Sequence, residues 1–291
     1  MSSEGTPAKI LVLGAAGMLG HAVLRYLVDT GRHDVVGSVR SASGLHLLPA
    51  GLHGRILRGV DVENQDSLAA LFAQVRPTVV INCIGLVKQL AQADDPLSAL
   101  PINAMLPHRL SRLCSLVGAR LVHVSTDCVF AGTRGGYREA DTPDAHDLYG
   151  LSKFLGEVDA EHAITLRTSI IGHELGSAHG LVGWFLAQSG SVRGFSRAVF
   201  SGLPTVELAR VIDEVVLPRP ELRGLYHVSA EPINKLDLLR LVAQAYAKDI
   251  EIVPDDRLVL DRSLDSSRLR EQTGYVAPDW PELVRRMRAF G

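Results

Sequence analysis

The sequence KILVLGAAGMLGHAVLRYL, residues 9–27, decides the fold. It opens with the apolar run Ile10–Leu13, which predicts a buried parallel strand. Gly14, Gly17 and Gly20 follow with the spacing G-x-x-G-x-x-G, and the apolar residues after them recur with a helical period. A strand, a glycine turn and a helix in this order are typical of a turn that binds a dinucleotide.

The glycines of this turn suit a phosphate ligand for physical reasons. The chain must bend tightly, the pyrophosphate must approach the backbone, and the helix must pack closely on the strand. The N-terminus of the helix also offers free N–H groups and the positive end of its dipole. We therefore predict cofactor contacts at Gly14, Gly17, Met18, Leu19 and Gly20. A glycine-rich turn that binds nothing is the alternative.

The composition indicates a globular protein with one large core. The chain has 291 residues, of which 46% are hydrophobic and 21% are charged, as in ordinary folded proteins. The net charge of −2 and the lack of a long basic run argue against a nucleic-acid partner. The polar N-terminal segment and the short apolar runs predict neither a signal peptide nor a membrane span, so we expect a cytoplasmic protein.

The cysteines and histidines give no sign of a metal site or a disulfide framework. Cys83, Cys114 and Cys128 are odd in number and lack C-x-x-C spacing. We expect each of them to be a small buried apolar side chain. The 11 histidines are scattered and form no H-E-x-x-H motif, so we predict no metal ligand.

Strands alternate with helices through the first two-thirds of the chain. We predict strands at residues 33–39, 55–60, 78–81 and 121–124, and helices at 65–75 and, interrupted by prolines, at 97–117. This alternation favours an α/β fold with a doubly wound, mostly parallel sheet. Ligands of such sheets bind at the carboxyl ends of the strands, where we expect Gly14, Asn82 and Thr126.

The end of the second predicted strand bears on the choice of cofactor. Folds that select NAD often place Asp or Glu there to hold the ribose hydroxyls. This chain has Ser38 and Arg40 instead, and a guanidinium pairs well with the 2′-phosphate of NADP. We therefore favour NADP(H) over NAD(H), with a solvated loop arginine as the alternative.

Tyr149 and Lys153, in the sequence YGLSK, are candidates for proton transfer. They are four residues apart and share one face of a helix that begins near Asp147. An ammonium near a phenol favours the phenolate, so we expect a lowered pKa for Tyr149. The pattern Y-x-x-x-K also occurs on ordinary surface helices. Its position after a dinucleotide turn and a strand that ends in Ser125 and Thr126 favours a catalytic role.

Taken together, these motifs resemble the extended short-chain dehydrogenase/reductase family, and within it the dTDP-4-dehydrorhamnose reductases. The matching segments are GAAGMLG (14–20), VSTDCVFAG (124–132), YGLSK (149–153), LRTSIIG (166–172), GLPTVELA (202–209), GLYHVSA (224–230) and LDSSRLREQTGYVAPDW (264–280). The first three are common to the wider family, and the later ones resemble the sugar-nucleotide reductases. The resemblance implies a Rossmann domain at residues 8–165, joined by a late strand from 200–230, and a smaller C-terminal α/β substrate lobe at 166–291.

The resemblance also implies roles for single residues. Thr126 would hydrogen-bond the substrate carbonyl, Tyr149 would be the general acid, and Lys153 would bind the nicotinamide ribose. Asn103 matches the asparagine that supports the lysine in this family, with a helix-kink residue as the alternative. The other expected cofactor contacts are Asp61, Val62, Cys83, Ile84 and Gly85.

Substrate contacts are expected from Lys88, Ser125, Asp127, Cys128 and Arg167. A solvated Lys88 and an ion-paired Arg167 are the alternatives. Cys128 stands where the reductases usually carry tyrosine, and this difference removes a polar group near the expected substrate. The segment 195–203 also lacks the Asp-Gln that precedes Gly-x-Pro-Thr in the family.

The activity implied by the resemblance is NAD(P)H-dependent reduction of a nucleotide-linked 4-keto-6-deoxy sugar, in polysaccharide or deoxysugar biosynthesis, by a homodimer. One alternative is an epimerase or dehydratase of the same family, although Asp127-Cys128 is not the Asp-Glu of the dehydratases. Another is a non-catalytic NADP-binding regulatory subunit, such as that of methionine adenosyltransferase. The presence of Thr126, Tyr149 and Lys153 together argues against this second alternative.

Overall fold

The computed structural model describes residues 7–86 and 91–291. At its centre is a seven-stranded parallel sheet with the order β11-β6-β5-β4-β1-β2-β3. The strands are β1 (Lys9–Leu13), β2 (Asp34–Val39), β3 (Ile56–Arg58), β4 (Val79–Asn82), β5 (Arg120–Thr126), β6 (Ala163–Thr168) and β11 (Gly224–His227). The strand order reverses between β1 and β4, which is where open α/β sheets bind their ligands.

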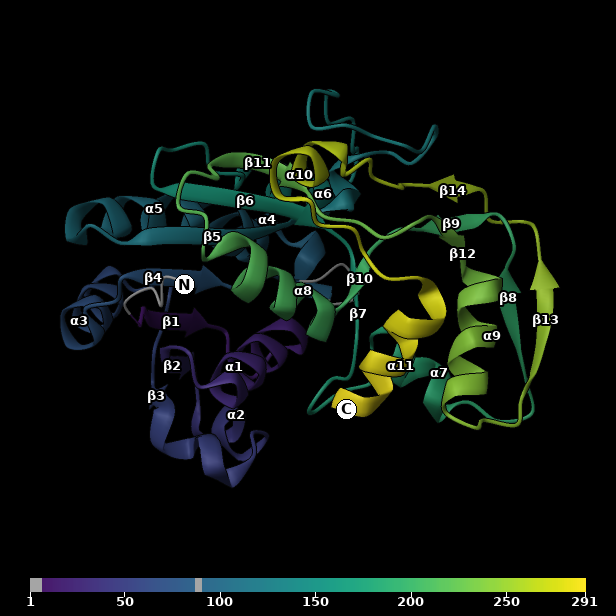
Figure 1. The fold of residues 1–291 in the computed structure, drawn as a ribbon, viewed down its shortest axis with the longest axis horizontal. Helices are drawn as coiled ribbons and strands as arrows, with labels where there is room; N and C mark the ends of the chain where they lie inside the picture. Colours follow the sequence, from purple (N-terminus) through teal and green to yellow (C-terminus); the bar gives the residue numbers. More distant parts are fainter. Residues whose placement is uncertain (1–6, 87–90) are drawn as a thin grey trace.

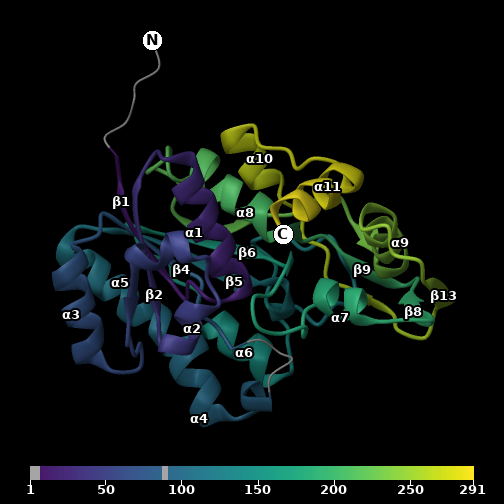
Figure 2. The same ribbon diagram turned by 90° about the horizontal axis from the view of Figure 1, so that it is seen from below.

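Helices cover both faces of this sheet, as Figure 2 shows. One face carries α1 (Met18–Thr30) and α8 (Thr205–Val211), and the other carries α3 (Gln65–Val75), α5 (Leu106–Val117) and α6 (Leu148–Leu155). Ile10 and Val12 pack into the first layer and Leu11 and Leu13 into the second, because successive side chains of a strand alternate. The prediction of a doubly wound α/β fold is confirmed.

A smaller lobe from the C-terminal part of the chain lies beside the sheet, on the right in Figure 1. It contains α7 (Leu181–Ala187), α9 (Lys235–Ala245) and α11 (Trp280–Phe290), with β8 (Ser191–Phe195) paired to β13 (Glu251–Asp255), and β9 (Ala198–Phe200) between β12 (Ile233–Asn234) and β14 (Leu260–Asp261). The same part of the chain also supplies α8 and β11 to the main sheet. The division into a cofactor domain and a substrate lobe stays a prediction.

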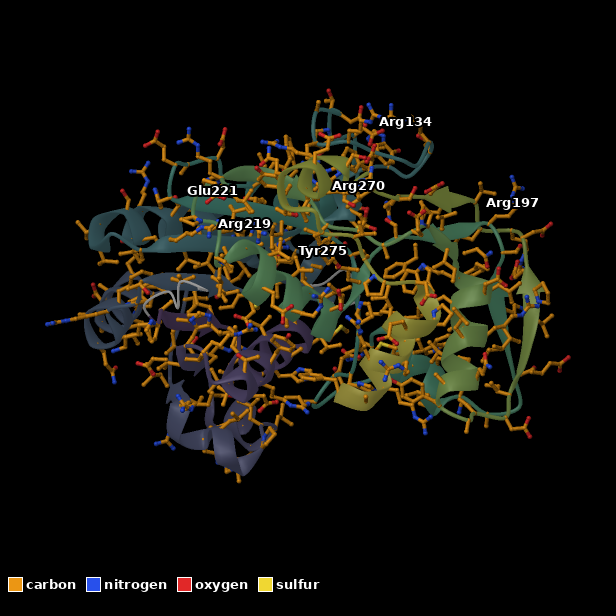
Figure 3. All side chains as sticks on the ribbon, viewed as in Figure 1. Arg134, Arg197, Arg219, Glu221, Arg270 and Tyr275 are labelled. Carbon is orange, nitrogen blue, oxygen red and sulfur yellow. The ribbon has the colours of Figure 1, made fainter. Side chains whose placement is uncertain are left out.

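Contacts at the boundary tie this lobe to α8. The Tyr275 hydroxyl donates a hydrogen bond to Glu207 Oε1 at 3.0 Å, and Arg286 Nη1 of α11 donates to Glu207 Oε2 at 2.9 Å. Figure 3 shows Tyr275 beside α8, below α10 (Ser267–Thr273), whereas Arg134 and Arg197 lie at the rim of the molecule. Because the Glu207 side chain is only 1% exposed, these bonds fix the lobe against the first helical layer.

The predicted helix at 97–117 is three segments in the structure. A short α4 (Pro96–Ala99) leads into the π-helical segment η3 (Leu100–Met105), and α5 follows. Pro101 and Pro107 lack the N–H groups that a continuous α-helix would use, so the ladder changes its register here. No helix in residues 7–86 and 91–291 has the length and apolar character needed to cross a membrane.

Candidate active site

The glycine turn after β1 has the geometry expected of a phosphate-binding turn. Gly14 has φ of +79°, which favours glycine. A Cβ atom on Gly20 would overlap the carbonyl oxygen of Gly14, so a larger residue would push α1 away from the turn. Gly17 is the N-cap of α1, and no side chain of the described residues caps this helix. Its first N–H groups therefore suit an anionic ligand.

A cleft of about 440 Å³ opens at the carboxyl ends of the central strands. Its lining brings together the predicted residues Gly17, Met18, Leu19, Cys83, Ile84, Gly85, Ser125, Thr126, Asp127, Cys128, Tyr149 and Lys153. Gly14 and Gly20 shape the turn behind this lining. Lys88 falls outside the residues that the structure describes. The cleft is thus formed by the ends of β1, β4 and β5 together with α6.

Four other predicted cofactor residues lie near the ends of β2 and β3, outside the lining of the cleft. The carbonyl oxygen of Ser38 accepts a hydrogen bond from the Ala15 N–H at 3.0 Å, so this strand end touches the glycine turn. Arg40 is exposed. Asp61 Oδ1 accepts from the Glu63 N–H at 3.0 Å, which shapes the turn that also contains Val62.

Lys153 is buried on α6, and its ammonium donates a hydrogen bond to the carbonyl oxygen of Val124 at 2.8 Å. Burial lowers the pKa of Lys153 to about 8, while the negative charge of Glu157 opposes the shift. The neighbouring thiol of Cys83 has a pKa raised to about 12 by burial. At neutral pH the lysine is therefore a cation fixed at the end of β5.

Tyr149 differs from the expectation of a lowered pKa. Burial raises the pKa of its phenol, and a hydrogen bond with the side chain of Thr126 opposes this only in part. Because Lys153 binds the Val124 carbonyl, its ammonium does not stabilise a phenolate here. The phenol is thus protonated at neutral pH, which suits a residue that donates a proton.

Thr126 is held by the turn that follows β5. Its hydroxyl donates to Asp127 Oδ1 and accepts from the Cys128 N–H, both at 3.2 Å. Burial raises the pKa of the Asp127 carboxyl, and the charges of Arg262 and Lys235 oppose that shift. Burial also raises the pKa of the Cys128 thiol to about 12, so this thiol is neutral.

Close packing of the backbone at position 150 explains why a glycine follows Tyr149. A Cβ atom at this position would overlap the carbonyl oxygen of Cys128. The Gly150 N–H also donates to Asp147 Oδ1 at 2.8 Å, which caps α6 as the sequence predicted. The close approach at Gly150 brings Tyr149 up to the turn that holds Thr126.

Asn103, in the π-helical segment η3, braces the other wall of the cleft. Its side chain accepts from the Leu86 N–H at 2.9 Å and donates to the Leu86 carbonyl and to Ser152 Oγ, both at 3.2 Å. Asn103 is 1% exposed and is absent from the lining of the cleft. It therefore holds the backbone next to Gly85, and direct contact with a cofactor stays a prediction.

Arg167 forms a buried ion pair, which is one of the two alternatives that the sequence left open. The residue is 1% exposed and does not line the cleft. Its guanidinium is bound to Glu157 and His227 instead. The sequence could not show this, because these partners come from a helix end and from the late strand β11.

Two cations in the lining were missed at the sequence level. Lys235 is the first residue of α9, and Arg262 follows β14, so both come from the small lobe. Arg262 donates to the Phe130 carbonyl at 2.7 Å, with its Nη1 at 3.6 Å from Cys128 Sγ. The Asn234 cap marks the start of α9 and so could have indicated Lys235, whereas no local pattern marks Arg262. In residues 7–86 and 91–291, no group of three or more His, Cys, Asp or Glu side chains could hold a metal ion.

Comparison with known proteins agrees with this geometry. A sequence profile described as the RmlD substrate binding domain matches residues 8–287. The dTDP-4-dehydrorhamnose reductase of Aggregatibacter actinomycetemcomitans is 24% identical over 308 aligned positions, covering 97% of this chain and 99% of the relative. Methionine adenosyltransferase 2 subunit beta of Xenopus tropicalis is 27% identical over 264 positions, covering 82% and 72%.

A solved structure is also similar. The dTDP-4-dehydrorhamnose reductase of Bacillus anthracis strain Ames, in complex with NADP, has a TM-score of 0.79 at 21% identity. The match covers 98% of this chain and 100% of the other. At this identity the likeness shows the fold.

Proposed function

This chain belongs to the RmlD substrate binding domain family, and on that premise we propose that it is an NAD(P)H-dependent reductase of a nucleotide-linked 4-keto-6-deoxy sugar. The observation that carries the proposal is the meeting of Thr126, Tyr149 and Lys153 with the glycine turn in one cleft. A proton donor, a carbonyl-binding hydroxyl and a phosphate-binding turn are together what the reduction of a carbonyl by a nicotinamide requires.

The described residues fit a nicotinamide dinucleotide. The turn at Gly17, with the uncapped start of α1, would hold the pyrophosphate, and Lys153 would hold the nicotinamide ribose. The backbone at Cys83 and Gly85 would lie along the cofactor. When bound, the cofactor supplies a hydride to the keto carbon. The protein's own part is to orient the sugar carbonyl and to provide a proton.

Tyr149 and Thr126 would carry the proton chemistry. The Tyr149 phenol, kept protonated by burial, donates its proton to the oxygen that develops negative charge at C4. The Thr126 hydroxyl, which donates to Asp127 Oδ1 in this structure, would turn to donate its hydrogen bond to the same substrate oxygen. A donor that is already oriented by the protein stabilises such an oxygen more than solvent does, because it does not have to reorient during the reaction.

We further propose that the cofactor is NADP(H) rather than NAD(H). Arg40 is exposed at the end of β2, and the next helix, α2 (Ala42–His46), packs against the glycine turn, since a Cβ on Gly44 would lie 3.6 Å from the Ala16 Cβ. A 2′-phosphate would pair with the Arg40 guanidinium.

The small lobe would bind the anionic part of the substrate. Lys235 and Arg262 place two cations in the lining of the cleft, near the buried carboxyl of Asp127. We propose that they face the diphosphate of the nucleotide sugar. The homodimer and the cytoplasmic location stay predictions.

The test is consumption of NADPH with a panel of dTDP-, UDP- and GDP-linked 4-keto-6-deoxy sugars. Oxidation of NADPH by one of them supports the proposal and identifies the nucleotide. Tight NADPH binding without turnover on any member would contradict it. That outcome would favour a regulatory subunit, to which the likeness with methionine adenosyltransferase 2 subunit beta points.

A further inference from the structure

A buried ion pair lies directly behind the cleft. Glu157, two residues after the end of α6, accepts hydrogen bonds from Arg167 Nε at 2.9 Å and Nη2 at 2.6 Å. The same carboxylate accepts from the hydroxyl of Ser125 at 2.7 Å. The side chains of Arg167 and Glu157 are 1% and 11% exposed. A paired, buried carboxylate is thus fixed on the residue immediately before Thr126.

Neutral groups contact the far side of the Arg167 guanidinium. Its Nη1 donates to Nε2 of His227 at 3.0 Å, so this imidazole carries its proton on Nδ1, which donates to the Tyr137 carbonyl at 3.0 Å. Burial lowers the pKa of His227 to about 3, so the ring stays neutral. The guanidinium carbon also lies 5.0 Å above the ring of Phe130. Glu157 is therefore the carboxylate bound directly to Arg167, whereas Glu139 accepts from the backbone N–H of His227 at 2.8 Å.

Glu157 and Lys153 hold neighbouring residues of β5, since the Lys153 ammonium donates to the Val124 carbonyl at 2.8 Å and Glu157 accepts from the Ser125 hydroxyl at 2.7 Å. Three other groups lie near this ammonium: the Val124 carbonyl and the His123 imidazole from β5, and the Cys83 thiol from the end of β4. At neutral pH these three groups are uncharged. Glu157 thus supplies the negative charge that opposes the loss of a proton from the buried lysine.

We propose that Glu157 is a positioning residue of this site, which fixes Ser125 beside Thr126 and keeps Lys153 protonated at neutral pH. It touches neither substrate nor cofactor and acts through these two residues. The part that Lys153 plays in turnover rests on the proposed function. Its protonation state does not, and can be measured on the protein alone.

The first experiment follows the 13Cε resonances of the five lysines in protein labelled at lysine, as a function of pH. The signal of Lys153 is identified by its loss in Lys153→Arg. We expect Glu157→Gln to move the titration midpoint of Lys153 downward by roughly one pH unit. An unchanged midpoint in Glu157→Gln overturns the proposal.

Arg167→Gln is the matched variant, because it breaks the same ion pair but keeps the carboxylate. Both variants lose a buried partner and are expected to melt at lower temperature. Only Glu157→Gln should lower the midpoint of Lys153, whereas Arg167→Gln should leave it unchanged or raise it. If both lower it equally, the effect is structural and the proposal fails. If Glu157→Gln does not fold, the double variant Glu157→Gln/Arg167→Gln is compared with Arg167→Gln alone, and a midpoint of Lys153 that is no lower in the double variant overturns the proposal.

The second readout is NADPH affinity against pH, measured by protein-to-cofactor fluorescence transfer. The pH at which affinity falls should move downward with the lysine midpoint in Glu157→Gln. The control is Glu161→Gln, whose carboxylate is 90% exposed and pairs with Arg223 at 3.2 Å, and which should change neither quantity. A shift in both quantities without reduction of any sugar would support the role of Glu157 and contradict only the proposed substrate.

Discussion

At the scale of single residues, burial sets the protonation of the site more than neighbouring charge does. The sequence suggests that Lys153 lowers the pKa of Tyr149, because the two share a helix face. In the structure the ammonium is bound to the Val124 carbonyl, and burial raises the pKa of the phenol. A protonated phenol beside Thr126 is the form that reduction of a carbonyl needs, so the altered pKa agrees with the proposed direction of the reaction.

Replacement of Tyr149 by phenylalanine removes the proposed proton donor and little else. We expect kcat to fall by about 10²–10⁴ while NADPH affinity stays within a factor of about two. Steady-state kinetics and a fluorescence titration with NADPH measure the two quantities. Turnover equal to that of the unchanged protein would remove Tyr149 from the mechanism.

The pKa of Lys153 predicts a basic limit to activity. Its value in the folded protein, about 8, is below the ordinary 10.5, so the ammonium is present below pH 8 and is lost as the pH rises through that value. We expect kcat/KM for the sugar to fall above about pH 8. A profile that stays flat to pH 10, in a protein shown to remain folded, would contradict this.

The substitution Arg40→Ala tests the cofactor preference. Loss of the guanidinium should weaken NADPH binding by about tenfold and leave NADH binding unchanged, because only NADPH carries the 2′-phosphate. Isothermal titration with both cofactors measures the difference. Arg58→Ala, at the end of the neighbouring β3, is an exposed matched control. Equal losses for both cofactors in Arg40→Ala would rule out the pairing.

At the scale of elements, close backbone approaches fix α6 against its neighbours. A Cβ on Gly150 would overlap the Cys128 carbonyl, and one on Gly156 would overlap the Asn103 carbonyl. Both contacts join α6 to walls of the cleft, one at the turn after β5 and one at η3. The position of Tyr149 and Lys153 is therefore set by two glycines of their own segment rather than by side-chain packing alone.

Gly150→Ala should disturb both stability and turnover. The added methyl group must displace α6 or the turn at Cys128, so we expect a loss of about 1–3 kcal/mol in the free energy of unfolding. We also expect a lower kcat with a smaller change in NADPH affinity. Gly54→Ala is the control, since a Cβ there meets no atom within 4 Å in the described chain. Equal stability of the two variants, measured by urea unfolding, would contradict the close approach.

At the scale of the whole molecule, buried histidines link folding to pH. Burial lowers the pKa of His227 to about 3 and also lowers the pKa of His21, His123 and His173. A depressed pKa in the folded state means that the unfolded chain binds protons first. The stability is therefore complete above pH 6.5 and falls as the pH drops below it.

Between pH 6.5 and pH 5 we expect His227 alone to reduce the free energy of unfolding by about 2 kcal/mol. Urea unfolding at both values measures the loss. His227→Gln should lower the stability at neutral pH and make it less dependent on pH in this range. A free energy of unfolding that is the same at pH 7 and pH 5 would show that these histidines have the same pKa in the folded and the unfolded chain.

Much of the fold followed from local patterns in the sequence. The glycine turn and the helix that begins at Asp147 depend on neighbouring residues, and both are present in the structure. The surroundings of Arg167 and Arg262 could not be predicted in the same way. Their partners are brought together by β11 and by the small lobe, so the contacts depend on tertiary packing across distant segments. The prediction of a lowered pKa for Tyr149 was wrong for the same reason, because the burial that raises this pKa depends on the assembled cleft.

The position of β11 late in the sequence affects how the chain folds during synthesis. Residues 169–223 separate β6 from the strand that pairs with its outer edge. On a ribosome that adds roughly 5–20 residues per second, β6 waits on the order of 3–10 s with unpaired backbone groups at that edge. A nascent chain arrested before Gly224 should therefore bind chaperones or self-associate, whereas one arrested well after His227 should resist protease. Folding during synthesis, and not only the stability of the finished sheet, therefore depends on β11.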